Sequence, residues 1–238
     1  MKYLRAIILF IFPSFILSLV YRKKLKIGFS IIITEKLQFS DNIQIGHGNF
    51  IKIKELNLSN KSLIGHLNYI KGNFKLKMKN NASIRHQNKI TSRFDNCETK
   101  HFILEEYASI QIKHLFDVTS NIRIGANTLF AGVGTQVWTH AFYLEDQGHG
   151  RHRIEGDINI GNNVNINSRC TLCCGINICS NTIIGANCCI NKDIAVSGLY
   201  VNQPLRYIPY NTKEKLNKMK PYKIEGEYKF FRKNSSQN

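Results

Sequence analysis

The side chains best suited to move a proton gather in one segment of the chain. His140 follows Trp138 and Thr139, and His149 and His152 lie a few residues further on, in a stretch rich in glycine and arginine. Because an imidazole has an unperturbed pKa of about 6.5, each histidine is a candidate general base near neutral pH. The residue types alone leave open which one acts, or whether all three are solvated surface histidines.

Trp138, Glu145 and Asp146 are the other side chains of this segment that could serve such a base. Glu145 or Asp146 could orient an imidazole by accepting a hydrogen bond from its second nitrogen, and His149 and His152 could instead contact the substrate. Trp138 could form the wall of a binding pocket or pack the loop onto the protein. Both interpretations of the tryptophan stay open.

A six-residue repeat flanks this segment and must position it. Mostly apolar side chains recur at multiples of six, in two series offset by two residues. The first series is Ile124, Ile160, Ile166, Leu172, Ile178, Ile184 and Ile190, and the second is Ile122, Ile158, Val164, Cys170, Ile176, Thr182 and Cys188. Hexapeptide repeats are typical of a parallel β-helix, in which each short strand points two residues inward. A sandwich of alternating strands would not keep one register through 160–190.

Three hexads make one coil of about 18 residues, so Cys170 and Cys188 should stack one above the other. Weaker hexads precede the clear ones, and the register slips around 77–110, where we expect a loop or an irregular coil. These weaker hexads are Leu58, Ile64, Ile70 and Leu76, and then Ile112, Val118, Ile124 and Phe130. Because the repeat stops after Phe130, we expect residues 131–157 to form a loop inserted at a corner of the helix, where functional residues concentrate.

The cysteines point to a reducing compartment. Seven cysteines, with two adjacent pairs, do not fit a secreted disulfide framework and favour reduced thiols in the cytosol. Cys170-x-x-Cys173 is a single short spacing without a second pair, which is a weak signal for zinc. We therefore expect no metal.

The N-terminus carries an uncharged apolar run, residues 6–20, with basic residues on both sides. As a helix this run would reach roughly 22 Å, short of a hydrocarbon core of about 30 Å, and Pro13 would kink it. We expect residues 1–30 to bind an anionic membrane surface, on the cytoplasmic face of the inner membrane. Packing onto the protein itself, cleavage and a true span remain alternatives.

The formal net charge of +17 is spread unevenly. Residues 31–89 carry +7 and residues 211–238 carry +5, whereas residues 90–210, with the clearest hexads and the histidines, carry −1. Such a field suits an anionic membrane or a nucleic acid. No nucleic-acid-binding motif or basic face with stacking aromatics accompanies it, so we expect no nucleic acid partner and assign the charge to membrane binding.

The hexads, the Trp138-Thr139-His140 segment and the end of the repeat together resemble the bacterial hexapeptide-repeat acyltransferases. Residues 191–194 (NKDI) match a turn of that family, and residues 202–208 (NQPLRYI) match its closing AGNPAK-x-I segment. The closing segment departs from the pattern, with Asn-Gln replacing Gly-Asn and Arg206 replacing lysine. The resemblance covers 110–208 well and 40–110 loosely. It implies a homotrimer of left-handed β-helices, active sites between subunits, and His140 as the general base.

The same resemblance implies where acetyl-CoA, the acyl donor, would bind. Gly185, Ala186 and Asn187 match a corner along which the family passes the pantetheine chain, although a turn alone also favours small residues there. Lys192 and Arg206 are cations at the end of the repeat, where the phosphates of CoA would lie.

The expected fold class is all-β, a left-handed parallel β-helix over 31–208 that carries the loop insertion. A hydrophobic, helical N-terminal segment (1–30) would precede it and a basic tail (209–238) would follow. The expected activity is CoA-dependent O-acetylation of a sugar hydroxyl in a surface polysaccharide or its lipid-linked precursor, with a glycan acceptor held by Trp138, Glu145, His149 and His152. Alternatives are acetylation of a small soluble acceptor (serine, a free sugar or amino-sugar, an antibiotic) and a β-helix carbonic anhydrase, which would hold zinc with three histidines.

Overall fold

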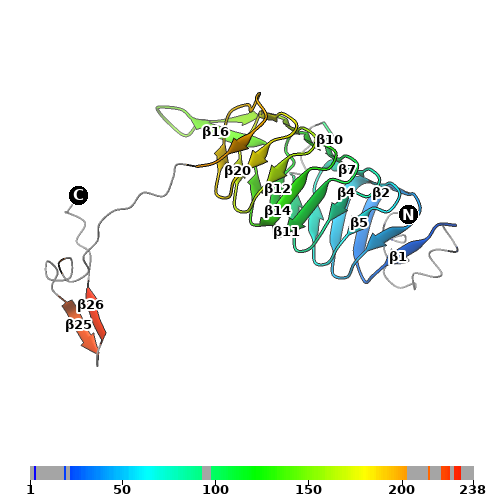
Figure 1. Ribbon diagram of the computed structural model, residues 1–238, viewed down its shortest axis with the longest axis horizontal. Helices are drawn as coiled ribbons and strands as arrows, with labels where there is room; N and C mark the ends of the chain where they lie inside the picture. The colour runs from blue at the N-terminus through cyan, green and yellow to red at the C-terminus, as the bar shows by residue number, and fades with distance from the viewer. Residues whose placement is uncertain are drawn as a thin grey trace. The chain divides into compact units, whose positions relative to one another are not determined.

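A computed structural model describes residues 22–92 and 98–202, a hairpin over 221–225 and 228–231, and three single residues, Tyr3, Leu19 and Glu214. Residues 22–202 wind into a stack of parallel coils that confirms the predicted β-helix (Figure 1). The first strand begins at Leu25, inside the range predicted for the N-terminal segment. The predicted helical segment itself lies almost wholly outside the described residues.

One face of the β-helix is a nine-stranded sheet, with one strand from each coil. Its strands are β1 (Leu25–Ile27), β3 (Ile43–Ile45), β5 (Leu63–Ile64), β8 (Ser83–Ile84), β11 (Ser109–Ile112), β14 (Leu129–Val133), β19 (Asn165–Ile166), β22 (Ile183–Ile184) and β24 (Leu199–Tyr200). We call it the first face.

The other two faces belong to a single sheet, because two long strands turn the corner between them. These strands are β2 (Ile31–Phe39) and β4 (Phe50–Leu58). The second face continues with β6 (Tyr69–Lys71), β9 (Lys89–Thr91), β12 (Leu115–Asp117), β15 (Gln136–Val137), β20 (Thr171–Leu172) and β23 (Cys189–Ile190). The third face continues with β7 (Phe74–Met78), β10 (Lys100–Leu104), β13 (Ile122–Ile124), β18 (Ile158–Ile160) and β21 (Asn177–Ile178).

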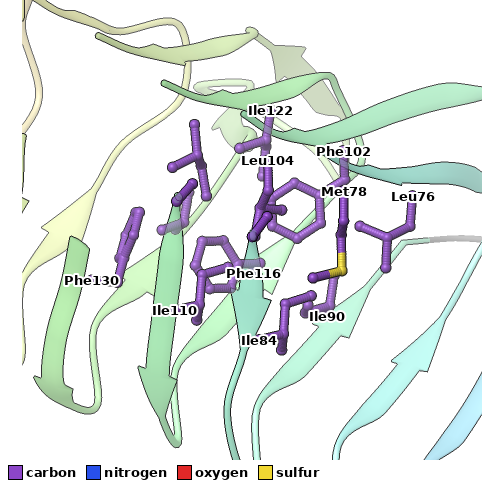
Figure 2. Packing of buried hydrophobic residues seen from close by; sticks show 14 of the residues in the cluster. Leu76, Met78, Ile84, Ile90, Phe102, Leu104, Ile110, Phe116, Ile122 and Phe130 are labelled. Atoms are coloured by element: carbon purple, nitrogen blue, oxygen red, sulfur yellow. The ribbon is translucent and has the colours of Figure 1, made fainter. Parts of the chain in front are cut away.

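The hexad positions form the core, as predicted. Every member of the two clear series is buried, and so are Leu58, Ile64, Ile70 and Leu76, whereas Ile112 of the other weak series is only half-buried. Cys170 and Cys188 occupy equivalent buried positions in successive coils, confirming that they stack. In the middle of the stack Phe116 lies between Phe102 and Phe130, with ring centroids 5.3 and 5.1 Å away (Figure 2).

Two features set the geometry of the corners. Where the third face turns into the first, residues with a left-handed backbone recur, among them Asn127, Asn163 and Asn181 at φ values of 56–60°. Asparagine tolerates this conformation better than most residues, which explains its frequency here. Between two paired strands, β8 and β11, the separation rises to 26 residues, against 18–20 in neighbouring coils. This long coil confirms the register slip predicted around 77–110.

A ladder of buried polar side chains runs up the corner between the first and second faces. The side-chain oxygen of Asn49 accepts the backbone N–H of Asn68, and Asn68 and Asn88 repeat this contact toward Asn88 and His114, each at 2.9 Å. His114 continues the ladder, because its Nδ1 accepts the backbone N–H of Thr135 at 3.1 Å. The amides thus satisfy backbone donors that the core would otherwise leave unpaired.

Two antiparallel hairpins depart from the coil pattern. One consists of β16 (His140–Leu144) and β17 (Arg151–Glu155) and leaves the stack between β15 and β18. The other, β25 (Pro221–Glu225) and β26 (Tyr228–Phe231), falls in the predicted basic tail. The first hairpin contains the histidines and is described next.

Candidate functional site

The hairpin of β16 and β17, which we call the arm (residues 140–155), projects from the stack of coils (Figure 1) and leaves it at the corner between the second and third faces. It occupies less of the chain than the predicted insertion, 131–157. Val137 is fully buried and pairs with Leu172 of the next coil, so the chain stays in the β-helix until Thr139. His140 is therefore the first residue of the arm, at the point where the hairpin leaves the coils.

The base of the arm is held tightly against the coils. Thr139 is fully buried, and its carbonyl accepts the N–H of Gly156 at 3.0 Å, which closes the hairpin. A β-carbon added at Gly156 would lie 2.5 Å from the Cα of Gly175 in the next coil. Only glycine permits this approach, so the coil above fixes where the arm leaves the stack.

Asp117 orients the imidazole of His140. Asp117 ends strand β12 in the coil below, and its Oδ2 lies 2.8 Å from Nδ1 of His140. The two side chains are 10% and 22% exposed, respectively, so the carboxylate is nearly sealed while the imidazole keeps access to solvent. Asp117 and His140 are close because Phe116 pairs with Val137 in the strand register, which aligns the ends of β12 and β15.

Two threonines complete the hydrogen bonding of the Asp117 carboxylate. The hydroxyl of Thr119 donates to Oδ1 at 2.7 Å. The hydroxyl of Thr139 lies 2.8 Å from Oδ2 and 2.9 Å from the main-chain oxygen of Asp117, and accepts the N–H of Ser120 at 2.9 Å. These hydrogen bonds hold the Asp117 carboxylate in one rotamer.

The geometry assigns the two nitrogens of His140 different tasks. Since an ionised carboxylate only accepts hydrogen bonds, Nδ1 carries the proton and donates it to Asp117. Nε2 is then an acceptor, able to take a proton from a bound hydroxyl or water. An imidazole oriented by a buried carboxylate is the arrangement of a general base.

Aromatic rings flank the imidazole. The Trp138 ring is edge-on to His140 with centroids 6.4 Å apart, and its Nε1 donates to Oε1 of Gln136 at 3.1 Å. On the other side Phe142 of the arm is also edge-on, at 5.4 Å. Trp138, His140 and Phe142 therefore form an aromatic row that runs from the second face onto the arm.

The acidic partner of His140 is a correction to the sequence prediction. Glu145 or Asp146 was the acid that the sequence offered to orient the imidazole, but Oε1 of Glu145 lies 2.9 Å from Nε2 of His152 and the partner of His140 is Asp117. The separation of 23 residues hides Asp117 from any local motif. One signal was available in the sequence. Val118 belongs to a hexad series, so the residue two positions earlier, Phe116, should also point inward, and Asp117 lies between these two inward positions.

The predicted donor-binding residues lie in two places. Gly185, Ala186 and Asn187 form the corner between the first and second faces, at the opposite edge of the second face from His140. A β-carbon at Gly185 would meet Val201 Cγ1 at 3.0 Å, so packing against the last coil already accounts for this glycine.

Lys192 lies nearer the candidate base. Extending the β15–β20–β23 register places it two coils above Thr139, at the same corner, with an exposed side chain. His149 is exposed in the turn of the arm, and Arg206 lies outside the described residues.

Within the described part of the chain, no group of three or more histidine, cysteine, aspartate or glutamate side chains is arranged to hold a metal ion. Cys170 and Cys173 are both free, and the thiol of Cys170 contacts the carbonyl of Gly185 at 3.1 Å inside the core. Over the same described residues, no helix has the length and hydrophobicity to cross a membrane.

Comparison with known proteins identifies the fold. No protein-family model and no curated protein sequence matches the chain. Among solved structures, the polysialic acid O-acetyltransferase OatWY superposes with a TM-score of 0.52 at 13% identity, over 82% of this chain and 97% of that one. The polySia-specific acetyltransferase NeuO gives a TM-score of 0.46 at 14% identity, over 77% of this chain and 84% of that one. At this identity the likeness to OatWY establishes a shared β-helix fold.

Proposed function

We propose that the protein is an acyltransferase that moves the acetyl group of acetyl-CoA to a hydroxyl of a surface polysaccharide or its lipid-linked precursor. The observation that carries the proposal is the 2.8 Å contact between Asp117 and His140, at an exposed edge of the β-helix. The polysaccharide acceptor is supported by the shared fold with OatWY, whose described substrate is polysialic acid.

His140 acts as the general base. Its Nε2 takes the proton of the acceptor hydroxyl while the hydroxyl oxygen forms a bond to the acetyl carbonyl carbon. The carbon–sulfur bond of the thioester then breaks, and the proton held on Nε2 passes to the departing sulfur of CoA. No net proton is gained or lost, so one histidine serves both steps.

Asp117 is a positioning residue. It holds the proton on Nδ1, which leaves Nε2 free to accept, and its negative charge stabilises the imidazolium that forms during transfer. The buried threonines keep this carboxylate from rotating toward solvent, so His140 meets each acceptor in the same orientation.

Lys192 is the described side chain best placed to neutralise a phosphate of the donor. Its ammonium is exposed at the corner that also carries Thr139, two coils away. Acetyl-CoA lying along this corner would bring its thioester toward His140 and its phosphates toward Lys192. The Gly185–Asn187 corner lies at the opposite edge of the second face from His140, so in this proposal it would serve the site of a neighbouring subunit.

A homotrimer is part of the proposal. One row of outward positions on the first face, which pairs in register from β5 to β24, carries no charged side chain. Its members are Leu63, Ser83, Ser109, Leu129, Asn165, Ile183 and Leu199. An uncharged row of this length on a narrow β-helix is suited to burial against another copy of the chain. Sedimentation velocity of the purified protein should then give the mass of a trimer.

We also propose that the apolar run of residues 6–20 holds the enzyme at the cytoplasmic face of the inner membrane, near lipid-linked acceptors. Because β1 begins at Leu25, a deletion meant to test this should stop at residue 21. The deletion variant should no longer sediment with vesicles that contain anionic lipid, while its acetyl transfer to a soluble acceptor stays intact. Unchanged sedimentation would contradict the proposal.

The experiment that tests the activity is product identification. The purified protein is incubated with acetyl-CoA and oligomers of sialic acid, with neutral glucose oligomers in parallel. Free CoA thiol is titrated, and the glycan is analysed by mass spectrometry. We expect thiol release that depends on the acceptor, together with glycan heavier by one acetyl group. Thiol release without acetylated glycan, or none with any saccharide, would overturn the proposal.

A further inference from the structure

The two faces of the arm differ in chemistry. In an antiparallel hairpin, directly paired residues share a face. His140 pairs with Glu155, Phe142 with Arg153, and Leu144 with Arg151. These six residues form what we call the His140 face of the arm. The opposite face carries Ala141, Tyr143, His152 and Ile154.

The opposite face is occupied by an internal contact. His152 pairs across the hairpin with Tyr143, and its Nε2 lies 2.9 Å from Glu145. Glu145 and His152 therefore satisfy each other on the side of the arm away from His140. This places two of the predicted acceptor contacts on the wrong side of the hairpin for a substrate that reaches the base.

The His140 face offers exposed groups right beside the base. Phe142 is 51% exposed although its ring lies edge-on to His140 at 5.4 Å. Arg153 is held by an ion pair to Glu155 at 2.6 Å. Arg151 is exposed and forms no ion pair with the described residues. Arg151, without an ion pair to the described residues, thus lies two residues along the strand from Arg153, which has one. Both arginines lie on the same face of the arm as His140.

We infer that the His140 face of the arm is an acceptor subsite for a carboxylate-bearing sugar, an inference that rests on the proposed acetyl transfer and names its substrate class. Phe142 lies against the apolar face of the sugar ring, and Arg151 binds the carboxylate. The hydroxyl to be acetylated then lies next to Nε2 of His140.

The chemistry of these side chains favours such a ligand. Guanidinium groups bind carboxylates through two parallel hydrogen bonds, which fixes orientation as well as position. Exposed aromatic rings beside polar groups offer flat apolar area to the C–H surfaces of sugars. The His140 face carries two arginines and one glutamate, so one positive charge is left for the ligand.

The arm is also suited to a role in binding because its two strands pair only with each other among the described residues. A two-stranded hairpin has little stability of its own in water, and this one exposes Phe142, Tyr143 and Leu144. Binding a ligand along its His140 face would hold it against the coils next to Asp117. Contact with a second copy of the chain is the competing use, and the experiment separates the two.

The test measures binding without catalysis. Equilibrium dialysis with labelled sialic acid oligomers, and with the same oligomers converted to carboxamides, gives affinities for a charged and an uncharged form of one sugar. Conversion to the carboxamide removes the negative charge and leaves the hydroxyl groups of the sugar unchanged. Trp138 is the single tryptophan of the chain, so a change in its fluorescence places the bound oligomer near His140.

Three variants separate the contributions. Arg151→Gln should weaken binding of the acidic oligomer about five- to tenfold, because it removes a charge-assisted hydrogen bond at an exposed site, and leave carboxamide binding unchanged. Phe142→Ala should weaken both ligands alike. Arg85→Gln, at an exposed arginine near strand β8 and far from the arm, should change neither.

Equal binding of the two oligomers by the wild-type protein, wild-type affinity in Arg151→Gln, or no binding at all would overturn the inference. Loss of self-association in Phe142→Ala, with saccharide affinity intact, would make the arm a subunit contact instead. Binding through Arg151 without acetyl transfer would refute only the proposed function. Equal acetyl transfer to both oligomers would refute only the subsite.

Discussion

Replacing Asp117 with asparagine removes one charge from the candidate site and almost no volume. In the wild-type protein Oδ2 accepts the Nδ1 proton of His140 at 2.8 Å. In Asp117→Asn, either the amide oxygen faces His140 without the charge, or the amide N–H faces it. The second orientation makes Nδ1 an acceptor and moves the imidazole proton to Nε2, where the base can no longer accept.

The structure sets the size of the expected effect. Two unit charges about 4 Å apart attract by about 4 kcal/mol at an effective dielectric constant of about 20. Solvent at the 22% exposed imidazole screens part of this. If about 2.7 kcal/mol of imidazolium stabilisation is lost, kcat falls about a hundredfold. The loss rises to about 10⁴-fold if the tautomer also inverts.

The assay is the rate of CoA thiol release at saturating acetyl-CoA and acceptor. We expect kcat to fall by about 10²–10⁴-fold while KM for acetyl-CoA stays within about twofold, because Asp117 lies in the coil below and is nearly sealed from solvent. Thr119→Val is the matched control, since it removes the hydrogen bond to Oδ1 and leaves His140 untouched. Its kcat should fall less than about tenfold.

Two results would refute this reasoning. One is a kcat for Asp117→Asn within about tenfold of wild type, because the charge would then contribute little to the reaction. The other is an equal loss of kcat in Thr119→Val, which would mean that the carboxylate acts only by holding the corner together. Thermal unfolding of both variants checks that the coils remain folded.

Three further predictions concern the scaffold. Burial lowers the pKa of His114 from 6.5 to about 4. The free energy of unfolding should therefore be full above pH 6.5 and fall by about 3 kcal/mol toward pH 4, because the imidazole is protonated in the unfolded chain before it is protonated in the folded one. His114→Asn, which keeps an acceptor for the N–H of Thr135, should reduce this fall when unfolding by urea is compared at pH 7 and pH 4.5. Phe116→Ala should cost about 3–5 kcal/mol in the same assay, because it empties the aromatic stack beneath the site. Gly156→Ala should lower kcat more than tenfold, because the added methyl meets Gly175 and displaces the arm, and wild-type kcat would show that the base of the arm is free to shift.

The β-helix was predictable because its core repeats. Each coil places side chains of the same kind at the same inward positions, so Ile166, Leu172 and Ile178 reveal the fold from their spacing alone. The corner conformation is equally local, since asparagine recurs at Asn127, Asn163 and Asn181. His140 was singled out by the resemblance of the Trp138-Thr139-His140 segment to the hexapeptide-repeat acyltransferases, since the residue types alone left three histidines open.

Asp117 was not predictable in the same way. Its distance from His140 depends on the pairing of Phe116 with Val137, and the sequence separation of residues paired between successive coils varies from 16 to 36 in the described part of the chain. A hexad series gives the inward positions but not which residues of successive coils align. The faces of the arm were hidden for the same reason, because a shift of one residue in the pairing of β16 and β17 would exchange them.

The central claim is that His140, oriented by Asp117, is the base of an acetyl transfer. Its most direct test is the turnover of purified His140→Ala with acetyl-CoA and a saccharide acceptor that the wild-type protein acetylates, with and without added imidazole. We predict a fall in kcat of about 10²–10⁴-fold and partial recovery with imidazole, which can accept the proton from the vacated space. A kcat within about tenfold of wild type, or a loss that imidazole leaves unchanged, would contradict the claim.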